Sequence, residues 1–185
     1  MIWRFFPTLD PQVDRVLSRY LHILAESCRT ILISFPRDLD SRFTEREVGA
    51  VCEWVESGAP IHAMRDNVVH HVPLLGAGWG ASLSKEGIRK EWEYSWLKIL
   101  NDSLTYSART RKGPDQIILT RYIWPWARNM SLQHDSYTCQ YYPGSIGFPT
   151  QRRDQDYNFI AAVGNMRIWV ECPEMCRRNK NWTHC

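Results

Sequence analysis

An apolar strand pattern stands directly before a helical pattern in the first third of the chain. Residues Thr30–Phe35 form an apolar, β-rich run that ends at a proline, as expected of a buried strand. A polar turn follows, and Thr44 stands three residues before Glu47, which is the spacing of a helix-capping box. Apolar residues then recur with a helical period over 45–56, and Gly58 marks the expected helix end.

The rest of the chain continues this alternation of strands and helices. Residues 61–64 have a short strand pattern, and 158–170 have the pattern of one or two strands. Helical patterns cover 85–100 and 115–124, and the second is expected to stop at the proline that follows it. A glycine-rich loop is expected over 75–80. Strands that alternate with helices predict an α/β fold.

Composition excludes several classes of protein. The chain has 185 residues, of which 44% are hydrophobic and 23% charged, which suits an ordinary globular domain and excludes disorder, collagen and coiled coil. The net charge is +3 and no long basic run occurs, so nucleic acid is not an expected partner. No apolar stretch reaches the roughly 18 residues of a membrane-spanning helix, so no transmembrane segment is expected.

Cysteines are concentrated at the C-terminus. The chain has six of them, and three lie in the last 14 residues. An even number with such a cluster predicts disulfide bonds and an oxidising compartment. The expected disulfide residues are Cys139, Cys172, Cys176 and Cys185, with the pairing open. A zinc site made by the last three with His184 is the alternative, although adjacent ligands at 184 and 185 make tetrahedral closure difficult.

Three N-glycosylation sequons begin at Asn101, Asn129 and Asn181. Together with the cysteines they favour the lumen of the secretory pathway, such as the Golgi, or secretion. The N-terminus has no basic segment followed by an apolar core, so no signal peptide is expected there. A cytoplasmic location is the expectation if the chain is complete as given.

The carboxylate pair of Asp38 and Asp40 is the strongest chemical candidate. Two carboxylates two residues apart, after an apolar strand, can converge on one divalent cation if the backbone turns there. Such a cation would bridge the phosphates of a sugar nucleotide and neutralise a departing diphosphate. A solvated loop is the alternative, since the same spacing recurs at Asp154 and Asp156. A phosphatase role, with one aspartate as nucleophile, is disfavoured because Arg42 stands where that pattern has Thr or Val.

Five strings follow one another along the chain. They are RDLDSRFTEREVGAVCEWVESG (37–58), HAMRDNVVHHVPLLGAGWG (62–80), GPDQIILTRYIWP (113–125), HDSY (134–137) and ECPEMCRRNKNWTHC (171–185). This set resembles a family of glycosyltransferase-like proteins of the GT-A type. The resemblance implies a partial GT-A-like mixed sheet flanked by helices, and metal-dependent transfer of a sugar from a nucleotide-sugar donor to a glycan or protein acceptor. It also implies a divalent cation, Mn²⁺ or Mg²⁺, as cofactor.

The resemblance assigns roles to single residues. Asp38 and Asp40 would bind the metal, and His134 would add a third ligand. Asp66 or Asp115 would lie near the acceptor as the catalytic base. The substrate-binding residues would be Arg37, Arg42, His62, Arg65, His70, Gly78, Trp79 and Gln116.

Several of these positions have a purely structural alternative. The histidines can be ordinary hydrogen-bonding residues. Arg65 and Asp66 can form an internal ion pair. Trp79 can pack in the core, and Asp115 can stabilise the N-terminus of its helix.

The domain organisation has three expected parts. Residues 1–36 are expected to be an N-terminal remnant with an insertion over 20–36, residues 37–171 the glycosyltransferase-like domain, and residues 172–185 a cysteine-rich tail. Only 37 residues precede Asp38, so contacts to the base and ribose of a donor would be missing, and weak binding with little turnover is expected. The alternative functions are a non-catalytic remnant that binds glycan or protein, and a small disulfide-bonded secreted binding module.

Overall fold

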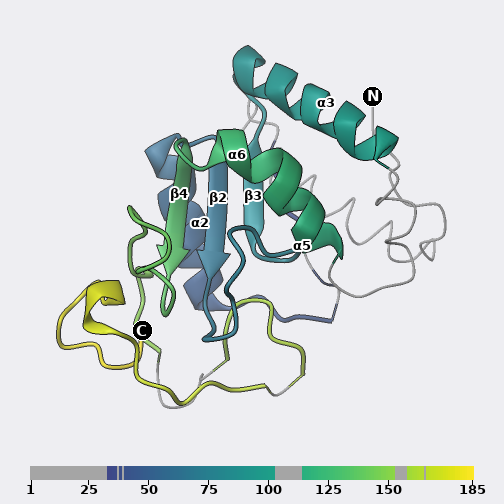
Figure 1. Ribbon diagram of the computed structural model, residues 1–185. Helices are drawn as coiled ribbons and strands as arrows, with labels where there is room; N and C mark the ends of the chain where they lie inside the picture. The colour runs from purple at the N-terminus through teal and green to yellow at the C-terminus, as the bar shows by residue number, and fades with distance from the viewer. Residues whose placement is uncertain (1–32, 37, 39, 103–113, 153–157, 165) are drawn as a thin grey trace. The chain divides into compact units, whose positions relative to one another are not determined.

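A four-stranded mixed sheet is the centre of the structure (Figure 1). Strands β1 (Ile33–Ser34), β2 (Ile61–Arg65), β3 (Trp79–Ser82) and β4 (Ser131–Asp135) lie in the order β1-β3-β2-β4. Strand β3 pairs antiparallel with both of its neighbours, whereas β2 and β4 are parallel. Strands β1, β2 and β4 therefore all run in the same direction.

The computed structural model describes residues 33–36, 38, 40–102, 114–152, 158–164 and 166–185. These residues belong to one compact unit, Ile33–Cys185. The expected remnant and insertion lie almost entirely outside the described residues, but β1 falls inside the range expected to be inserted and pairs with β3. Arg37, Asp154 and Asp156 also lie outside the described residues.

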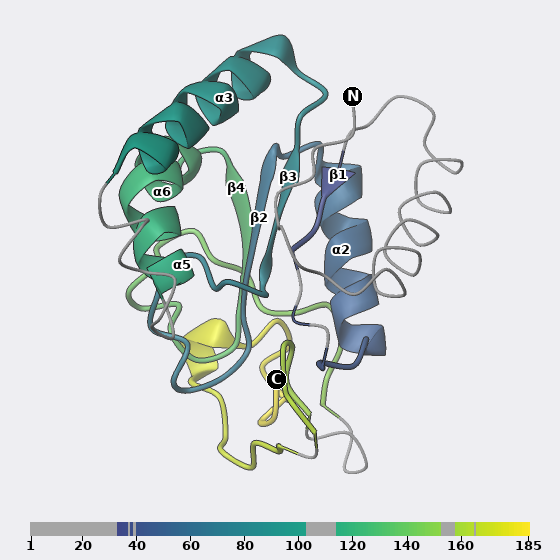
Figure 2. The ribbon, with the colours of Figure 1, turned by 90° about the vertical axis from the view of Figure 1, so that its right-hand side faces the viewer.

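Helices cover both faces of the sheet (Figure 2). Helix α2 (Glu45–Ser57) lies on one face, and α3 (Glu86–Asn101) lies on the other. The second face is also covered by a continuous helical segment made of α5 (Pro114–Ile118), the π-helix η2 (Leu119–Ile123) and α6 (Trp124–Ala127). The fold is thus α/β, with a mixed sheet flanked by helices. None of the described helices is long and apolar enough to cross a membrane.

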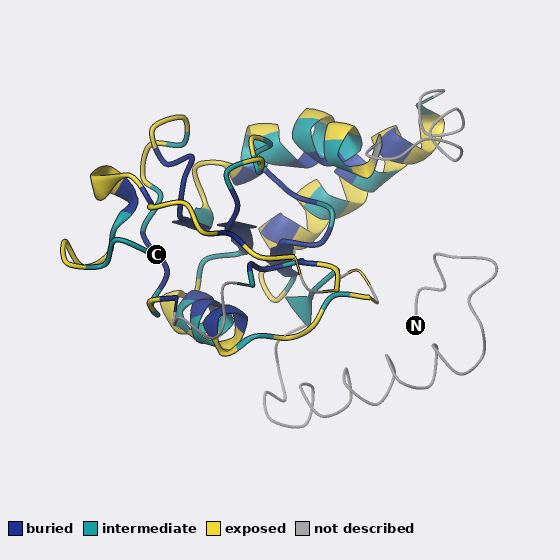
Figure 3. Ribbon diagram, turned by 90° about the horizontal axis from the view of Figure 1, so that it is seen from below, coloured by how far each residue is buried: buried dark blue, intermediate teal, exposed yellow. Residues whose placement is uncertain are grey.

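Helix α2 begins and ends as the sequence predicts. The Thr44 hydroxyl accepts a hydrogen bond from the Glu47 backbone N–H at 3.1 Å, which satisfies a free donor of the first turn. Gly58 ends the helix in the left-handed conformation, with φ of 65°, which a residue without Cβ adopts at little cost. Ala50 and Trp54 are buried on its inner face, while its outer face is exposed (Figure 3).

Strand β2 is buried along its whole length and divides the core in two. Ile61 and Ala63 belong to the larger core cluster, with residues of α3, η2 and α6. Met64 belongs to a second cluster with Ala50 of α2 and Phe148. This division follows from the geometry of a strand, in which successive side chains point to opposite faces of the sheet.

Two elements near the sheet differ from those that the sequence predicts. The loop expected over 75–80 ends earlier, because Trp79 and Gly80 already belong to β3. A Cβ on Gly80 would lie 3.0 Å from rings of both Phe35 and Trp54, so the glycine serves close packing within a strand. The helix expected to stop before Pro125 continues through it, because the proline stands in the first turn of α6, where no N–H is needed.

The strands expected over 158–170 are absent from the described residues of that range. Ala161 and Gly164 have positive φ angles of 66° and 64°, which interrupt an extended chain. Only an isolated antiparallel bridge forms there, between Val163 and Ser41. Strand β4, in contrast, was not expected from the hydrophobic pattern.

The outer edge of β4 is covered by the chain that follows it. The Ile146 N–H donates to the Gln133 carbonyl at 2.9 Å, and the Asp135 N–H donates to the Ile146 carbonyl at 2.9 Å. His134 and Ile146 thereby form an isolated parallel bridge.

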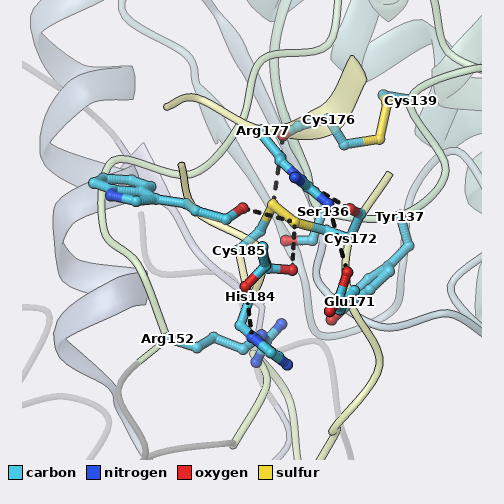
Figure 4. The surroundings of a disulfide bond; sticks show 12 residues. Ser136, Tyr137, Cys139, Arg152, Glu171, Cys172, Cys176, Arg177, His184 and Cys185 are labelled. Carbon is cyan, nitrogen blue, oxygen red and sulfur yellow. Dashed lines mark hydrogen bonds and ion pairs between the residues drawn. A yellow bond between two sulfur atoms is a disulfide. The ribbon is translucent and has the colours of Figure 1, made fainter. Parts of the chain in front are cut away.

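Two disulfide bonds hold the C-terminal tail. They join Cys139 to Cys176 and Cys172 to Cys185, with 5.8 Å between the Cα atoms of each pair (Figure 4). The tail includes a short 3₁₀ helix, η3 (Glu174–Cys176). The pairs involve the four cysteines that the sequence analysis expects in disulfides. The three cysteines of the alternative zinc site are divided between these two bonds in the structure.

Peptide mapping of the non-reduced protein is expected to recover these two linkages. Four cysteines should resist alkylation in denaturant until a reductant is added, whereas the exposed Cys52 thiol should be labelled at once. Replacing Cys139 and Cys176 by serine should lower the free energy of unfolding by about 1 kcal/mol more than replacing Cys172 and Cys185, because the first bond closes the longer loop. Equal costs, or other pairings, would contradict this assignment.

Candidate functional site

The carboxyl ends of the parallel strands β1, β2 and β4 lie together at one end of the sheet, which is called here its carboxyl edge. Asp38 and Asp40 follow β1, Asp66 follows β2, and Ser136 follows β4. In open α/β sheets, ligands bind at this edge, outside the carboxyl ends of the strands. The fold therefore brings three of the segments that the sequence singles out to the same edge.

Asp38 and Asp40 are exposed on a turn at this edge. The N–H and hydroxyl of Ser41 both donate to the Asp38 carbonyl, at 3.3 and 3.0 Å, so the backbone turns between the two aspartates. The bridge from Ser41 to Val163 attaches this turn to the rest of the fold. Both aspartates are thus exposed beside the hydrogen-bonded Ser41.

His134 lies in a buried hydrogen-bonded chain on the α2 side of the sheet. Its Nδ1 is 2.8 Å from Nε2 of His62, and its Nε2 is 3.1 Å from a carboxylate oxygen of Glu53 on α2. Glu53 in turn accepts hydrogen bonds of 2.6 and 2.8 Å from Arg178 of the C-terminal tail. Among the described residues, no three potential metal ligands come together, so His134 does not join the two aspartates in a three-ligand group.

Burial determines the protonation of these histidines. It lowers the pKa of His62 well below its ordinary value, and the charge of His134 lowers it further. Burial also lowers the pKa of His134, against the opposing effect of Glu53. The His62 ring stacks on Trp54 with centroids 5.2 Å apart, so this residue belongs to the core and not to an acceptor surface.

Asp66 is fully buried and bonded on all sides. Its carboxylate accepts hydrogen bonds from Arg46 at 3.0 Å, from the Ser136 hydroxyl at 2.7 Å and from Arg152. The Ile160 N–H donates a further bond at 3.1 Å. Burial alone would raise the pKa of Asp66, but Arg152 and Arg46 hold it below its ordinary value. The expected alternative of an ion pair between Arg65 and Asp66 is wrong, because Asp66 pairs with Arg46 and Arg152. Arg65 pairs with Asp135 instead.

Arg65 forms a second buried network with β4. Its guanidinium donates to Asp135 at 2.7 Å and to the Gln133 side-chain oxygen at 2.8 Å. It also lies 3.8 Å from the centre of the Tyr142 ring. Asp135 accepts further bonds from the N–H groups that follow it, including that of Tyr137 at 2.9 Å. Arg65 therefore positions the segment after β4 and has no free donor side toward a substrate.

The remaining predicted residues divide between interior and surface. Trp79 packs in the larger core, 5.4 Å from the Trp92 ring, and a Cβ on Gly78 would lie 2.9 Å from the Met64 carbonyl. His70 accepts from the Asp66 N–H at 3.1 Å, and burial lowers its pKa to about 4.

Asp115 is the exposed one of the two candidate bases. It begins α5, and its carboxylate oxygen lies within 1.9 Å of the position that a Cβ on Gly76 would occupy. The glycine-rich loop and the start of α5 therefore pack directly on one another. Gln116 beside it is half-buried, and Arg42 is exposed near the aspartate turn.

Several charged residues of these networks were not predicted as functional, among them Arg46, Arg152 and Glu53. Arg46 and Glu53 lie within the first of the five strings, 37–58. The sequence predicted the helix that contains them but not the residues with which they pair. Arg152 follows a coil segment with no periodic pattern. Nothing in its surroundings in the sequence indicates that it would be buried against Asp66.

Comparison with models of known protein families, with curated proteins and with solved structures finds no match to this chain. The interpretation of the site therefore depends on its own residues. Of the aspartates singled out in the sequence, Asp38, Asp40 and Asp115 are exposed, whereas Asp66 and its counterpart Asp135 are buried in ion pairs.

Proposed function

We propose that the chain binds a divalent cation through Asp38 and Asp40, for the transfer of a sugar from a nucleotide-sugar to a glycan or protein acceptor. The observation that supports this proposal is the placement of both exposed carboxylates on one turn at the carboxyl edge of the parallel strands. Carboxylate oxygens are the ligands preferred by Mg²⁺ and Mn²⁺. Such a cation, when bound, neutralises charge on the diphosphate.

Asp115 is the base in this proposal. An acceptor hydroxyl must lose a proton as it attacks the anomeric carbon, so the base has to reach solvent and the acceptor. Asp115 is exposed beside the glycine-rich loop, whereas the Asp66 carboxylate is enclosed by Arg46 and Arg152. Arg42, which is exposed, and Gln116, which is half-buried, are the substrate-binding residues in this proposal.

A second candidate function is a non-catalytic domain that binds glycan or protein. The burial of Asp66, His62 and Arg65 supports it, because each of these residues is enclosed in the fold. Among the described residues that were predicted for the site, few exposed polar groups remain for an enzyme active site.

The compartment in this proposal is the secretory lumen, such as the Golgi, or the extracellular space. Two disulfide bonds support it, since such bonds persist in oxidising compartments. The asparagines of all three sequons are also exposed.

Calorimetric titration of the full chain with Mn²⁺ and nucleotide-sugars tests the cation site. We expect binding that requires Mn²⁺ and weakens at least tenfold, about 1.4 kcal/mol, when Asp38 and Asp40 are both replaced by asparagine. The matched control replaces Asp154 and Asp156, which have the same spacing elsewhere in the sequence, and should bind as the unmodified chain does. Equal losses in the two variants would contradict the proposed site.

A turnover assay separates the two candidate functions. If the chain is a transferase, Asp115→Asn should lower turnover while Mn²⁺-dependent donor binding is retained. Donor binding without any turnover in the unmodified chain would instead support the non-catalytic domain.

A further inference from the structure

An open, shallow groove runs along the C-terminal half of α3, the helix at the top of Figure 1. We call it the α3 groove, and its lining residues are Tyr94, Leu97, Lys98, Asn101, Asp102 and Tyr122. The side chains of Tyr94 and Leu97 are large and apolar, and these residues are 56% and 60% exposed. Because they lie three residues apart on one helix, the two side chains form a small exposed apolar patch, which is a candidate contact surface.

Asn101, the first residue of a sequon, lies in this groove. Its side-chain nitrogen donates to the Leu97 carbonyl at 2.9 Å, so the amide is directed back along the helix toward the apolar side chains. The next residue, Asp102, accepts from Arg121 at 3.3 Å and from the Tyr122 hydroxyl. These bonds hold the end of α3 against η2 and fix the position of the amide.

We propose that Asn101 carries an N-linked glycan whose first sugar residues cover Leu97 and Tyr94. This inference depends on the proposed secretory compartment and not on the proposed transferase activity. The donor is a lipid-diphosphate-linked oligosaccharide supplied by the host cell. A bond forms between Asn101 Nδ2 and the anomeric carbon, the bond from that carbon to the lipid diphosphate breaks, the diphosphate leaves with the electron pair, and the amide loses one proton.

The geometry of α3 suits this occupant. A glycosylated amide retains one N–H, which is enough for the bond to the Leu97 carbonyl. With a rise of about 1.5 Å per residue, Leu97 and Tyr94 lie roughly 6 and 10 Å before Asn101. Sugar rings present C–H faces that pack on apolar and aromatic side chains. The Lys98 ammonium lies 4.1 Å from the centre of the Tyr94 ring, a contact that is weak at an exposed site.

The other two sequons differ in their surroundings. Asn129 lies in the turn before β4, and Asn181 lies in a turn of the tail, both exposed. Neither belongs to the residues that line the α3 groove. A stabilising contact between glycan and protein is therefore expected from Asn101 and not from these two sites.

The first test is secretion of the full chain from animal cells behind an added signal sequence, followed by glycopeptide mass spectrometry. We expect Asn101 to be occupied, and Asn101→Gln and Ser103→Ala to abolish the modification. If Asn129 and Asn181 are modified and Asn101 is not, this inference is overturned and the proposed compartment is unaffected. Absence of modification at all three sites would overturn this inference too. The proposed compartment is not at issue in this test, because the added signal sequence imposes it.

The second test measures the contact. Ser103→Ala removes the Asn101 glycan and should lower the Tm by about 2 °C. In a chain that also has Tyr94→Ser and Leu97→Ser, removing the glycan should leave the Tm unchanged. The matched control is Leu100→Ser, which alters an apolar residue of α3 that is 50% exposed but lies outside the groove, and should retain the full decrease. An equal decrease in all backgrounds would overturn the proposed contact.

Discussion

Replacing Asp66 by asparagine is expected to lower the free energy of unfolding by about 3–5 kcal/mol. The amide has nearly the same shape but no charge, so the buried guanidinium groups of Arg46 and Arg152 would lose their common counter-ion. Breaking a buried ion pair by removing one partner costs much more than the intact pair contributes, because it leaves uncompensated charge in the interior. Equilibrium denaturation with an unchanged m value measures this loss.

Asp115→Asn is the matched control in the same assay. Asp115 is exposed at the start of α5, so its replacement should cost less than about 1 kcal/mol. A cost for Asp66→Asn as small as that of the control would show that Asp66 does not stabilise the fold, and would return it to the set of candidate bases.

Stability is expected to fall steeply on mild acidification, through the buried histidines. The pKa values of His62, His70 and His134 are lowered in the folded chain, that of His70 to about 4, with burial as the largest cause. Between the ordinary pKa of about 6.5 and these lower values, the unfolded chain binds protons that the folded chain does not. For His70 this removes about 1.4 kcal/mol per pH unit, and His62 and His134 act in the same direction. The contribution is complete above about pH 7 and is progressively lost below pH 6.5.

The slope of unfolding free energy against pH, between pH 6.5 and 5, measures the effect. His70→Gln should remove one histidine's share of the slope, whatever its effect on absolute stability. His71→Gln, at the exposed neighbouring position, should leave the slope unchanged. A flat profile over this range, or equal slopes in the two variants, would contradict the assignment. Asp66 and Glu53, whose pKa values are lowered by their arginine partners, contribute only at more acidic pH.

Elements with local signals could be predicted from the sequence. Helix α2 was predicted because its cap, its apolar period and its terminal glycine all lie within 15 residues of one another. The predicted helix over 85–100 corresponds to α3, and the predicted strand over 61–64 corresponds to β2. The participation of four cysteines in disulfides followed from composition, whereas their pairing required the fold.

Strand β4 was missed because its interior is polar. Gln133, His134 and Asp135 are all buried, and a pattern search interprets such residues as exposed. They are buried because Arg65, His62 and Glu53, distant in sequence, supply their hydrogen-bond partners. Burial of a polar group depends on partners in space, and a linear pattern does not contain them.

Partners that are distant in sequence also explain why the sequence did not separate structural residues from candidate ligands. In the sequence, any polar side chain that follows a strand is a candidate ligand. The sequence does not show whether that side chain is exposed to solvent or paired with a buried arginine in the fold. For Asp66 the deciding residue is Arg152, which is 86 residues away along the chain. Asp38 and Asp40, in contrast, are exposed in the structure, as a short polar segment after an edge strand is expected to be.

The chain that follows β4 pairs with the outer edge of that strand, and this limits where a further strand can join the sheet. A strand edge with free N–H and C=O groups is a template for further strands, including those of other molecules. At β4 the bonds to Ile146 occupy that template. On the opposite side, β1 is the last strand of the described sheet. Any strand that extends the sheet, from another part of the protein or from a partner, would therefore be added beside β1, next to the turn that presents Asp38 and Asp40.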